Sequence, residues 1–84
     1  MGSAAQLRKA AQSISANISE GFGRGAGPER NHALRVARGE AEETIRHLRA
    51  NFAANRIEQS VLWRFRNRLV TIIKMLTSLL KRVA

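Results

Sequence analysis

Hydrophobic residues recur along this chain at intervals of three and four, the spacing that places them on one side of an α-helix. The strict alternation that is typical of a half-buried β-strand is absent, and the chain contains a single proline. Short loops at 22–27 and 54–57 separate three such segments. We therefore predict an all-α fold in one domain, residues 1–84. Its helices are expected at about 4–21, 28–54 and 58–83.

The first two predicted helices have narrow hydrophobic faces that are rich in alanine. In the first helix this face contains Leu7, Ala11, Ile14 and Ile18. The face of the second helix contains Leu34, Ala37, Ala41, Ile45, Leu48 and Phe52. Gly39 lies inside the second helix, where glycine costs about 1 kcal/mol relative to alanine. We expect a neighbouring helix to approach closely at Gly39 in compensation.

The third helix carries the widest hydrophobic face. Its main line contains Leu62, Phe65, Leu69, Ile72, Leu76, Leu79 and Val83, and the face is widened by Val61, Ile73 and Leu80. A face this wide contacts more than one neighbour, as in a helical bundle. Because the loops are short, adjacent helices should run antiparallel. The first two helices are too small to cover this face, so we expect the protein to be an oligomer.

The charge of the chain is strongly positive. Fifteen Lys and Arg residues stand against six acidic residues, giving a net charge of +9. This balance favours an anionic partner, of which RNA, DNA and an anionic membrane are the usual ones. The predicted nucleic-acid contacts are arginines of the second and third helices: Arg35, Arg38, Arg46, Arg49, Arg64 and Arg68. The four arginines of the second helix share one flank, which Glu42 interrupts, and Glu42 can pair with Arg38 or Arg46. The alternative to a phosphate-binding surface is therefore a solvated face with ion pairs inside the helix.

Trp63 lies between the hydrophobic face and the charges of the third helix. It is flanked in the chain by Arg64 and Arg66. An indole in this position can stack on a base or cover a contact between subunits. The second role is the preferred interpretation.

A glycine-rich stretch, Gly21 to Gly27, joins the first two helices. Loops that cradle phosphates or dinucleotides follow a β-strand, and a P-loop also ends in Lys-Ser or Lys-Thr. This stretch follows a helix and has no such ending. We interpret it as a structural turn in which Gly21 ends the first helix in a left-handed conformation and Phe22 packs on the bundle end. The turn motif comprises Asn17, Glu20, Gly21, Phe22 and Gly23, with Asn17 and Glu20 bonding the turn or the neighbouring helix.

Residues for catalysis or metal binding are not arranged in any recognisable set. The chain has no cysteine, and His32 and His47 lack companion ligands at metal-binding spacing. We find no nucleophile with a base and no paired acid and base. The sequence therefore predicts a protein that is not an enzyme and needs no metal ion or cofactor. No apolar run approaches the ~20 residues that span a bilayer, and no signal peptide is evident, so a cytoplasmic location without a membrane partner is expected.

Three stretches resemble a known family. The segment from Gln6 to Arg24, QLRKAAQSISANISEGFGR, resembles the hallmark of the bacterial intervening-sequence proteins, which are encoded within insertions of large-subunit ribosomal RNA genes. Residues 35–39 with Glu43 are similar to a helix of that family, and residues 73–80 look like its last helix. The resemblance implies an antiparallel four-helix bundle that assembles into a homopentamer and has no established enzymatic activity.

The resemblance also implies a relation in fold to the accessory variability protein of diversity-generating retroelements. That protein is a basic pentamer that binds nucleic acid and a reverse transcriptase. Two departures from the family pattern are visible. The long first helix of the family has no counterpart before Ala4, so three of the four helices are expected here, and Glu40 stands where a small Ser is usual.

Two functions follow from these features. The leading hypothesis is a non-enzymatic, homo-oligomeric protein that binds RNA or another nucleic acid through phosphates, without sequence preference. The alternative is a protein-interaction module, for example an accessory subunit of a nucleic-acid enzyme. In that case an apolar groove on the third helix would dock a partner helix at Leu62, Leu69, Ile73 and Leu80.

Overall fold

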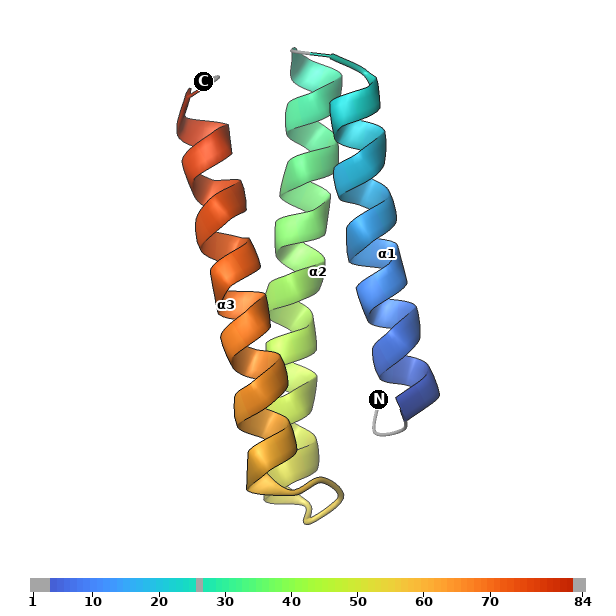
Figure 1. Ribbon diagram of the computed structural model, residues 1–84, viewed down its shortest axis with the longest axis vertical. Helices are drawn as coiled ribbons and strands as arrows, with labels where there is room; N and C mark the ends of the chain where they lie inside the picture. The colour runs from blue at the N-terminus through green and yellow to red at the C-terminus, as the bar shows by residue number, and fades with distance from the viewer. Residues whose placement is uncertain (1–3, 26, 83–84) are drawn as a thin grey trace.

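A computed structural model describes residues 4–25 and 27–82, which form three α-helices joined by short loops (Figure 1). Helix α1 spans Ala4–Gly23, α2 spans Pro28–Ala53 and α3 spans Gln59–Arg82. No strand occurs within these residues. The prediction of an all-α chain with three helices is thus confirmed for the part that the structure describes. Val83, assigned to the third helix from the sequence, lies outside the described residues.

The helices stand side by side in the order α1, α2, α3, each antiparallel to the next (Figure 1). Helix α2 packs against both neighbours, whereas in the described residues no Cα atom of α1 lies within 8 Å of a Cα atom of α3. The Cα positions extend over 42 × 21 × 14 Å, so the molecule is long and thin. Helix α2 therefore supports the other two, and each of them keeps a side that no helix of this chain covers.

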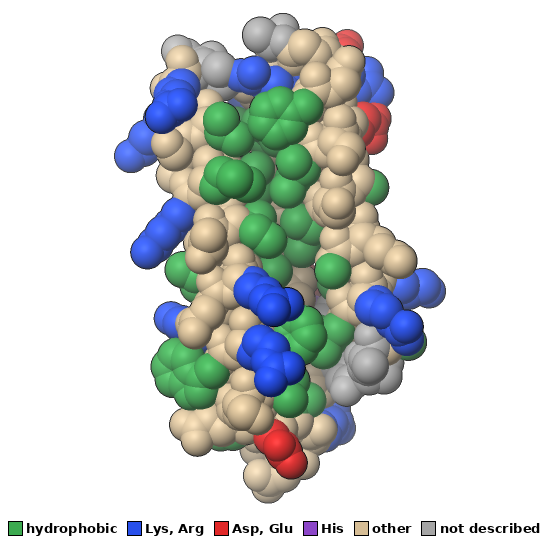
Figure 2. Space-filling model, viewed as in Figure 1, with side chains coloured by type: hydrophobic (Ala, Val, Ile, Leu, Met, Phe, Trp, Pro, Cys, Tyr) green, Lys and Arg blue, Asp and Glu red, His purple; other side chains and the backbone are tan. Residues whose placement is uncertain are grey.

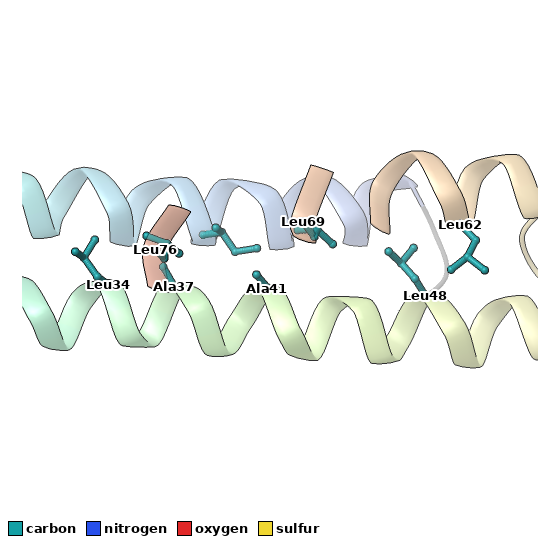
Figure 3. Packing of buried hydrophobic residues seen from close by; sticks show 8 residues of the cluster. Leu34, Ala37, Ala41, Leu48, Leu62, Leu69 and Leu76 are labelled. Carbon is teal, nitrogen blue, oxygen red and sulfur yellow. The ribbon is translucent and has the colours of Figure 1, made fainter. Parts of the chain in front are cut away.

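The hydrophobic core lies where α2 meets its neighbours. Helix α3 contributes three buried leucines at intervals of seven residues, about two helical turns: Leu62, Leu69 and Leu76. Facing them are Leu34, Ala37, Ala41 and Leu48 of α2, and α1 adds Ile14. In Figure 3, Leu76 lies next to Ala37 and Leu62 lies beside Leu48. The small side chains of Ala37 and Ala41 leave room for the leucines of α3 to pack closely against α2.

The hydrophobic face of α3 is only partly covered. Leu62 and Leu69 are buried in the core, so the expectation that they remain open to a partner helix is wrong. Apart from the buried Leu76, the other described residues of this face are half-buried. Figure 2 shows a band of hydrophobic side chains along the face between α3 and α1. We use the term apolar band for the half-buried hydrophobic residues of α1 and α3 that pack against the core: Leu7, Ile18, Phe65, Ile72, Ile73, Leu79 and Leu80.

Gly21 lies within α1 and does not end it. The helix continues for two more residues, and the glycines with positive φ are Gly25 at 72° and Gly27 at 138°. The predicted left-handed turn at Gly21 is therefore wrong. A Cβ atom at Gly21 would lie 3.3 Å from the Cβ atom of Ala33 and 3.3 Å from a methyl group of Leu34. Gly21 is thus required for the close approach of α1 and α2, while the later glycines supply the conformations of the turn.

Gly39 is exposed in the middle of α2. A Cβ atom added there would meet no atom within 4 Å in the described structure, so the predicted close approach of a neighbouring helix is wrong. The contacts of the residues on either side of Gly39 explain why no atom lies near it. Arg38 reaches across to α3 and Glu40 reaches across to α1. Gly39 lies between them and faces outward, because the two neighbours of α2 occupy its other sides.

Candidate nucleic-acid interface

Asn17 joins α1 to α2. Its Nδ2 atom donates a hydrogen bond of 2.7 Å to Oε1 of Glu40 and another of 3.0 Å to the carbonyl oxygen of Ser13. The hydroxyl group of Ser13 also donates to the Glu40 carboxylate. Of the two roles considered for Asn17, the structure shows bonding to the neighbouring helix. Glu40, the departure from the usual family residue, supplies the acceptor for both side chains.

Arg24 is held by two carboxylates at the turn between α1 and α2. Its Nη2 atom lies 2.8 Å from Oε1 of Glu20, and its Nη1 atom lies 3.0 Å from Oε2 of Glu29. The hydrogen bond that Arg24 donates to Glu20, followed by the one it donates to Glu29, raises the pKa of Arg24 above its usual value. Phe22 is 50 % exposed, so the bundle end covers only part of its ring. The charged side chains at this turn are therefore paired with one another.

Arg38 defines the side of the α2–α3 pair on which positive charge gathers. Its Nη1 atom donates a hydrogen bond of 3.3 Å to Oγ1 of Thr77. Arg49 follows Arg38 by eleven residues, and Arg66 precedes Thr77 by eleven, which is about three helical turns in each case. Because α2 and α3 are antiparallel, Arg49 and Arg66 lie at the same level and on the same side of the pair.

The same helical geometry extends this set of cations. Arg35 lies within about 60° of Arg38 around the axis of α2, and Lys74 and Lys81 lie within about 60° of Thr77 around α3. The resulting basic stripe follows the seam between the two helices. It contains Arg35, Arg38, Arg49, Arg66, Lys74 and Lys81. Arg38 and Arg66 are half-buried and the other four residues are exposed.

The acidic residues leave this stripe with a large excess of positive charge. Glu42 lies on it but makes no ion pair in the described part of the chain, so the predicted pairing with Arg38 or Arg46 is wrong. Arg46 lies at the outer edge of the stripe and pairs instead with Glu43, at 3.7 Å. Helix α3 contains no acidic residue between Gln59 and Arg82. Three of the other carboxylates, Glu20, Glu29 and Glu40, are bonded at α1 or at the turn between α1 and α2.

Arg64 and Arg68 lie on the opposite side of α3. They precede Thr77 by thirteen and nine residues, about three and a half and two and a half turns, which rotates both away from the stripe. Both side chains are exposed. The structure therefore groups three of the six predicted arginines, with Arg46 at their edge, and separates Arg64 and Arg68 from them.

Three stripe residues of α3 were absent from the predicted contacts: Arg66, Lys74 and Lys81. Their spacing of eight and seven residues already indicated a common side of the helix. The sequence did not show how α3 is rotated about its axis relative to α2. The hydrogen bond between Arg38 and Thr77 fixes this rotation.

Trp63 lies at the end of the basic stripe near the loop between α2 and α3. It precedes Thr77 by fourteen residues, about four turns, and so belongs to the same side of α3. Its side chain is 48 % exposed. The guanidinium carbon of Arg66 lies 5.2 Å from the centroid of the indole, within the range of a cation–π interaction.

Two properties of the described residues bear on other classes of function. None of the helices in 4–25 and 27–82 combines the length and hydrophobicity needed to cross a membrane. Within the same residues, no three His, Asp or Glu side chains are grouped so that they could hold a metal ion.

Comparison with known families decides the relationship of the chain. Residues 1–78 match the family model described as 23S rRNA-intervening sequence protein. The chain belongs to this family. The resemblance seen in the sequence is thereby confirmed. No curated protein and no solved structure matches the chain.

Within this intervening-sequence protein, the hallmark segment and the basic stripe occupy different places. The hallmark residues Asn17 and Gly21 hold α1 against α2. The stripe follows the other seam, between α2 and α3. The hallmark segment, residues 6–24, therefore builds the scaffold, and the candidate interface depends on residues outside it.

Proposed function

We propose that this protein binds RNA through its basic stripe, without enzymatic activity and without reading the base sequence. The observation that carries the proposal is the alignment of four arginines and two lysines along the α2–α3 seam, with a single carboxylate, Glu42, among them. The family name refers to 23S rRNA, which makes RNA the first nucleic acid to test. The cytoplasmic location expected from the sequence belongs to the same proposal.

The chemistry of the stripe fits phosphates better than bases. From Arg35 to Arg49 the stripe runs over fourteen residues of α2, about 21 Å along the helix axis. Guanidinium groups match phosphate oxygens in a bidentate fork, and lysine adds a point charge. Contacts of this kind position a protein on a nucleic acid but carry no sequence information. Binding is therefore expected to depend steeply on salt, because each neutralised phosphate releases counterions.

Two double variants test the proposal. Arg35→Gln with Arg49→Gln removes two exposed charges from the stripe, and Arg64→Gln with Arg68→Gln removes two exposed charges from the opposite side of α3. Affinity for a labelled RNA is measured by fluorescence polarisation between ~50 and ~200 mM salt. The stripe variant should bind more weakly, with a slope of log K against log salt reduced by about 1.4 to 1.8. The matched variant should keep the wild-type slope. Absence of binding by the wild type, or equal losses in both variants, would refute the proposal.

We also propose that the protein forms a homo-oligomer, which the resemblance to the family suggests is a pentamer. It is supported by the apolar band, since α1 and α3 carry half-buried hydrophobic residues but do not cover each other. A ring of subunits would repeat the basic stripe and strengthen the field at its surface. Sedimentation equilibrium measures the mass directly. A monomer at micromolar concentration would remove this element and leave RNA binding to be judged separately.

The apolar band also supports a second candidate function, the docking of a partner helix. An amphipathic helix binds such a surface by residues at helical spacing, and its affinity changes little with salt. A pull-down that recovers one helical partner in stoichiometric amount, equally at low and high salt, would favour this function. Binding that is lost on raising the salt would favour the basic stripe.

A further inference from the structure

Trp63 differs from the other exposed hydrophobic residues of α3 in its surroundings. It lies on the same side of α3 as the basic stripe, and Arg66 of that stripe is stacked near its ring. Met75 is equally exposed at 48 % but precedes Thr77 by only two residues, so it lies on the opposite side of the helix. An indole beside a row of cations is a combination found where proteins bind unpaired nucleotides.

We propose that Trp63 stacks on an unpaired base while the basic stripe holds the neighbouring phosphates, so that the preferred ligand is single-stranded RNA. The inference rests on the proposed function and adds the class of nucleic acid to it. A base inside a duplex is stacked on both of its faces and is not available to the indole, whereas an unpaired base is. Every base has such a face, so stacking here adds affinity without sequence readout.

Arg66 prepares the indole for this role. Its guanidinium group lies 5.2 Å from the ring centroid and also donates a hydrogen bond of 3.3 Å to Oδ1 of Asn67. These two contacts restrict the orientation of Trp63 before any ligand arrives, which lowers the entropy cost of stacking. Arg66 and Arg49 lie at the same level of the stripe, so a strand whose base stacks on Trp63 meets two cations at once.

The chain contains one tryptophan and no tyrosine, so Trp63 reports on its own occupancy. The intrinsic fluorescence of the wild-type protein is titrated with an unstructured single-stranded oligoribonucleotide and with the duplex of the same strand. Stacking of a base on the indole should quench the emission at saturation with the single strand and leave it nearly unchanged with the duplex. This measurement needs no substitution, so it does not depend on the folding of a variant.

Affinities of three variants complete the test: Trp63→Ala, Trp63→Phe and the matched control Met75→Ala. Trp63→Ala should weaken binding of the single strand by about 5- to 150-fold, which corresponds to ~1–3 kcal/mol for one stacked base. Its salt slope should match that of the wild type, because no phosphate contact is lost. Trp63→Phe should recover much of the affinity, and Met75→Ala should bind as the wild type does.

The outcomes separate this inference from the function on which it rests. If the emission of Trp63 does not change with the single strand, or if Trp63→Ala loses affinity for strand and duplex equally, stacking on an unpaired base is refuted. RNA binding by the stripe survives that result when Arg35→Gln with Arg49→Gln still lowers the salt slope. If the wild type binds neither ligand, both proposals fail together.

Discussion

Asn17 and Glu40, which are 23 residues apart in the chain, are joined by a hydrogen bond of 2.7 Å from the Asn17 amide to the Glu40 carboxylate. This bond links the second half of α1 to the middle of α2. Two residues before Glu40 in α2, Arg38 donates a hydrogen bond to Thr77 of α3. A single turn of α2 therefore holds both neighbouring helices by side-chain polar contacts, one on each side of the exposed Gly39.

Replacing Glu40 by alanine should lower the free energy of unfolding by about 1.5–3 kcal/mol, the usual contribution of hydrogen bonds to a charged group. Ser13 and Asn17 would both lose their acceptor at the α1–α2 contact. Glu42→Ala is the matched control, since it makes the same change in helix propensity two residues away and breaks no ion pair. Urea denaturation followed by circular dichroism measures both. Equal midpoints for the two variants would show that the contact contributes nothing.

Substitution of Gly21 by alanine should destabilise the protein by about 1–3 kcal/mol, because the added methyl group has no space. The Cβ atom of Ala33, 3.3 Å from the new position, cannot turn away, because an alanine side chain has no rotamer that would move its Cβ atom. Gly23→Ala changes the same residue type near the end of the same helix, where a Cβ atom meets nothing within 4 Å. That control should be neutral or slightly stabilising. Thermal unfolding of both variants, recorded side by side, tests the difference in sign.

Gly39→Ala should stabilise the isolated chain by about 1 kcal/mol, since alanine is favoured over glycine inside a helix and open space surrounds this position. The measurement is the unfolding midpoint at low protein concentration. Repeating it at high concentration provides the control. A loss of stability that appears only at high concentration would place another subunit against this side of α2, and a loss at every concentration would contradict the open position.

Leu76→Ala should cost about 2–5 kcal/mol, because this side chain is fully buried between α3 and α2 and its removal leaves a cavity. Met75→Ala, at the next residue, removes a side chain that is 48 % exposed and should change stability by less than about 1 kcal/mol. The two variants are compared by chemical denaturation. Similar losses would mean that the exposed side of α3 is covered in solution.

The existence of the helices could be predicted because helical periodicity is a local property. Residues three and four apart share a side of one helix whatever surrounds it. The buried leucines of α3 and the core positions Leu34, Ala37, Ala41 and Leu48 of α2 therefore follow from their spacing alone. The assignment of Ala11 and Phe52 to the buried faces is wrong, because both are exposed. Pro28 likewise marked the start of α2, because proline is favoured in the first turn of a helix.

The candidate interface could be predicted only in part, for the same reason. The spacing of Arg35, Arg38 and Arg49 showed that they share a flank of α2. Spacing within α3 could not show which of its cations would join them, because the rotation of one helix against another depends on packing between side chains distant in sequence. Arg66 joins the stripe and Arg68 does not, although they are two residues apart.

The sequence by itself determined three helices, an excess of positive charge and membership of a family, since each of these is carried by composition or by residues close together in the chain. The tertiary structure decided what Gly21, Gly39 and Glu40 do. Close packing, open space and a hydrogen bond between helices each depend on atoms from another part of the chain. The same holds for the basic stripe, which exists only because α2 and α3 meet in one register and at one rotation.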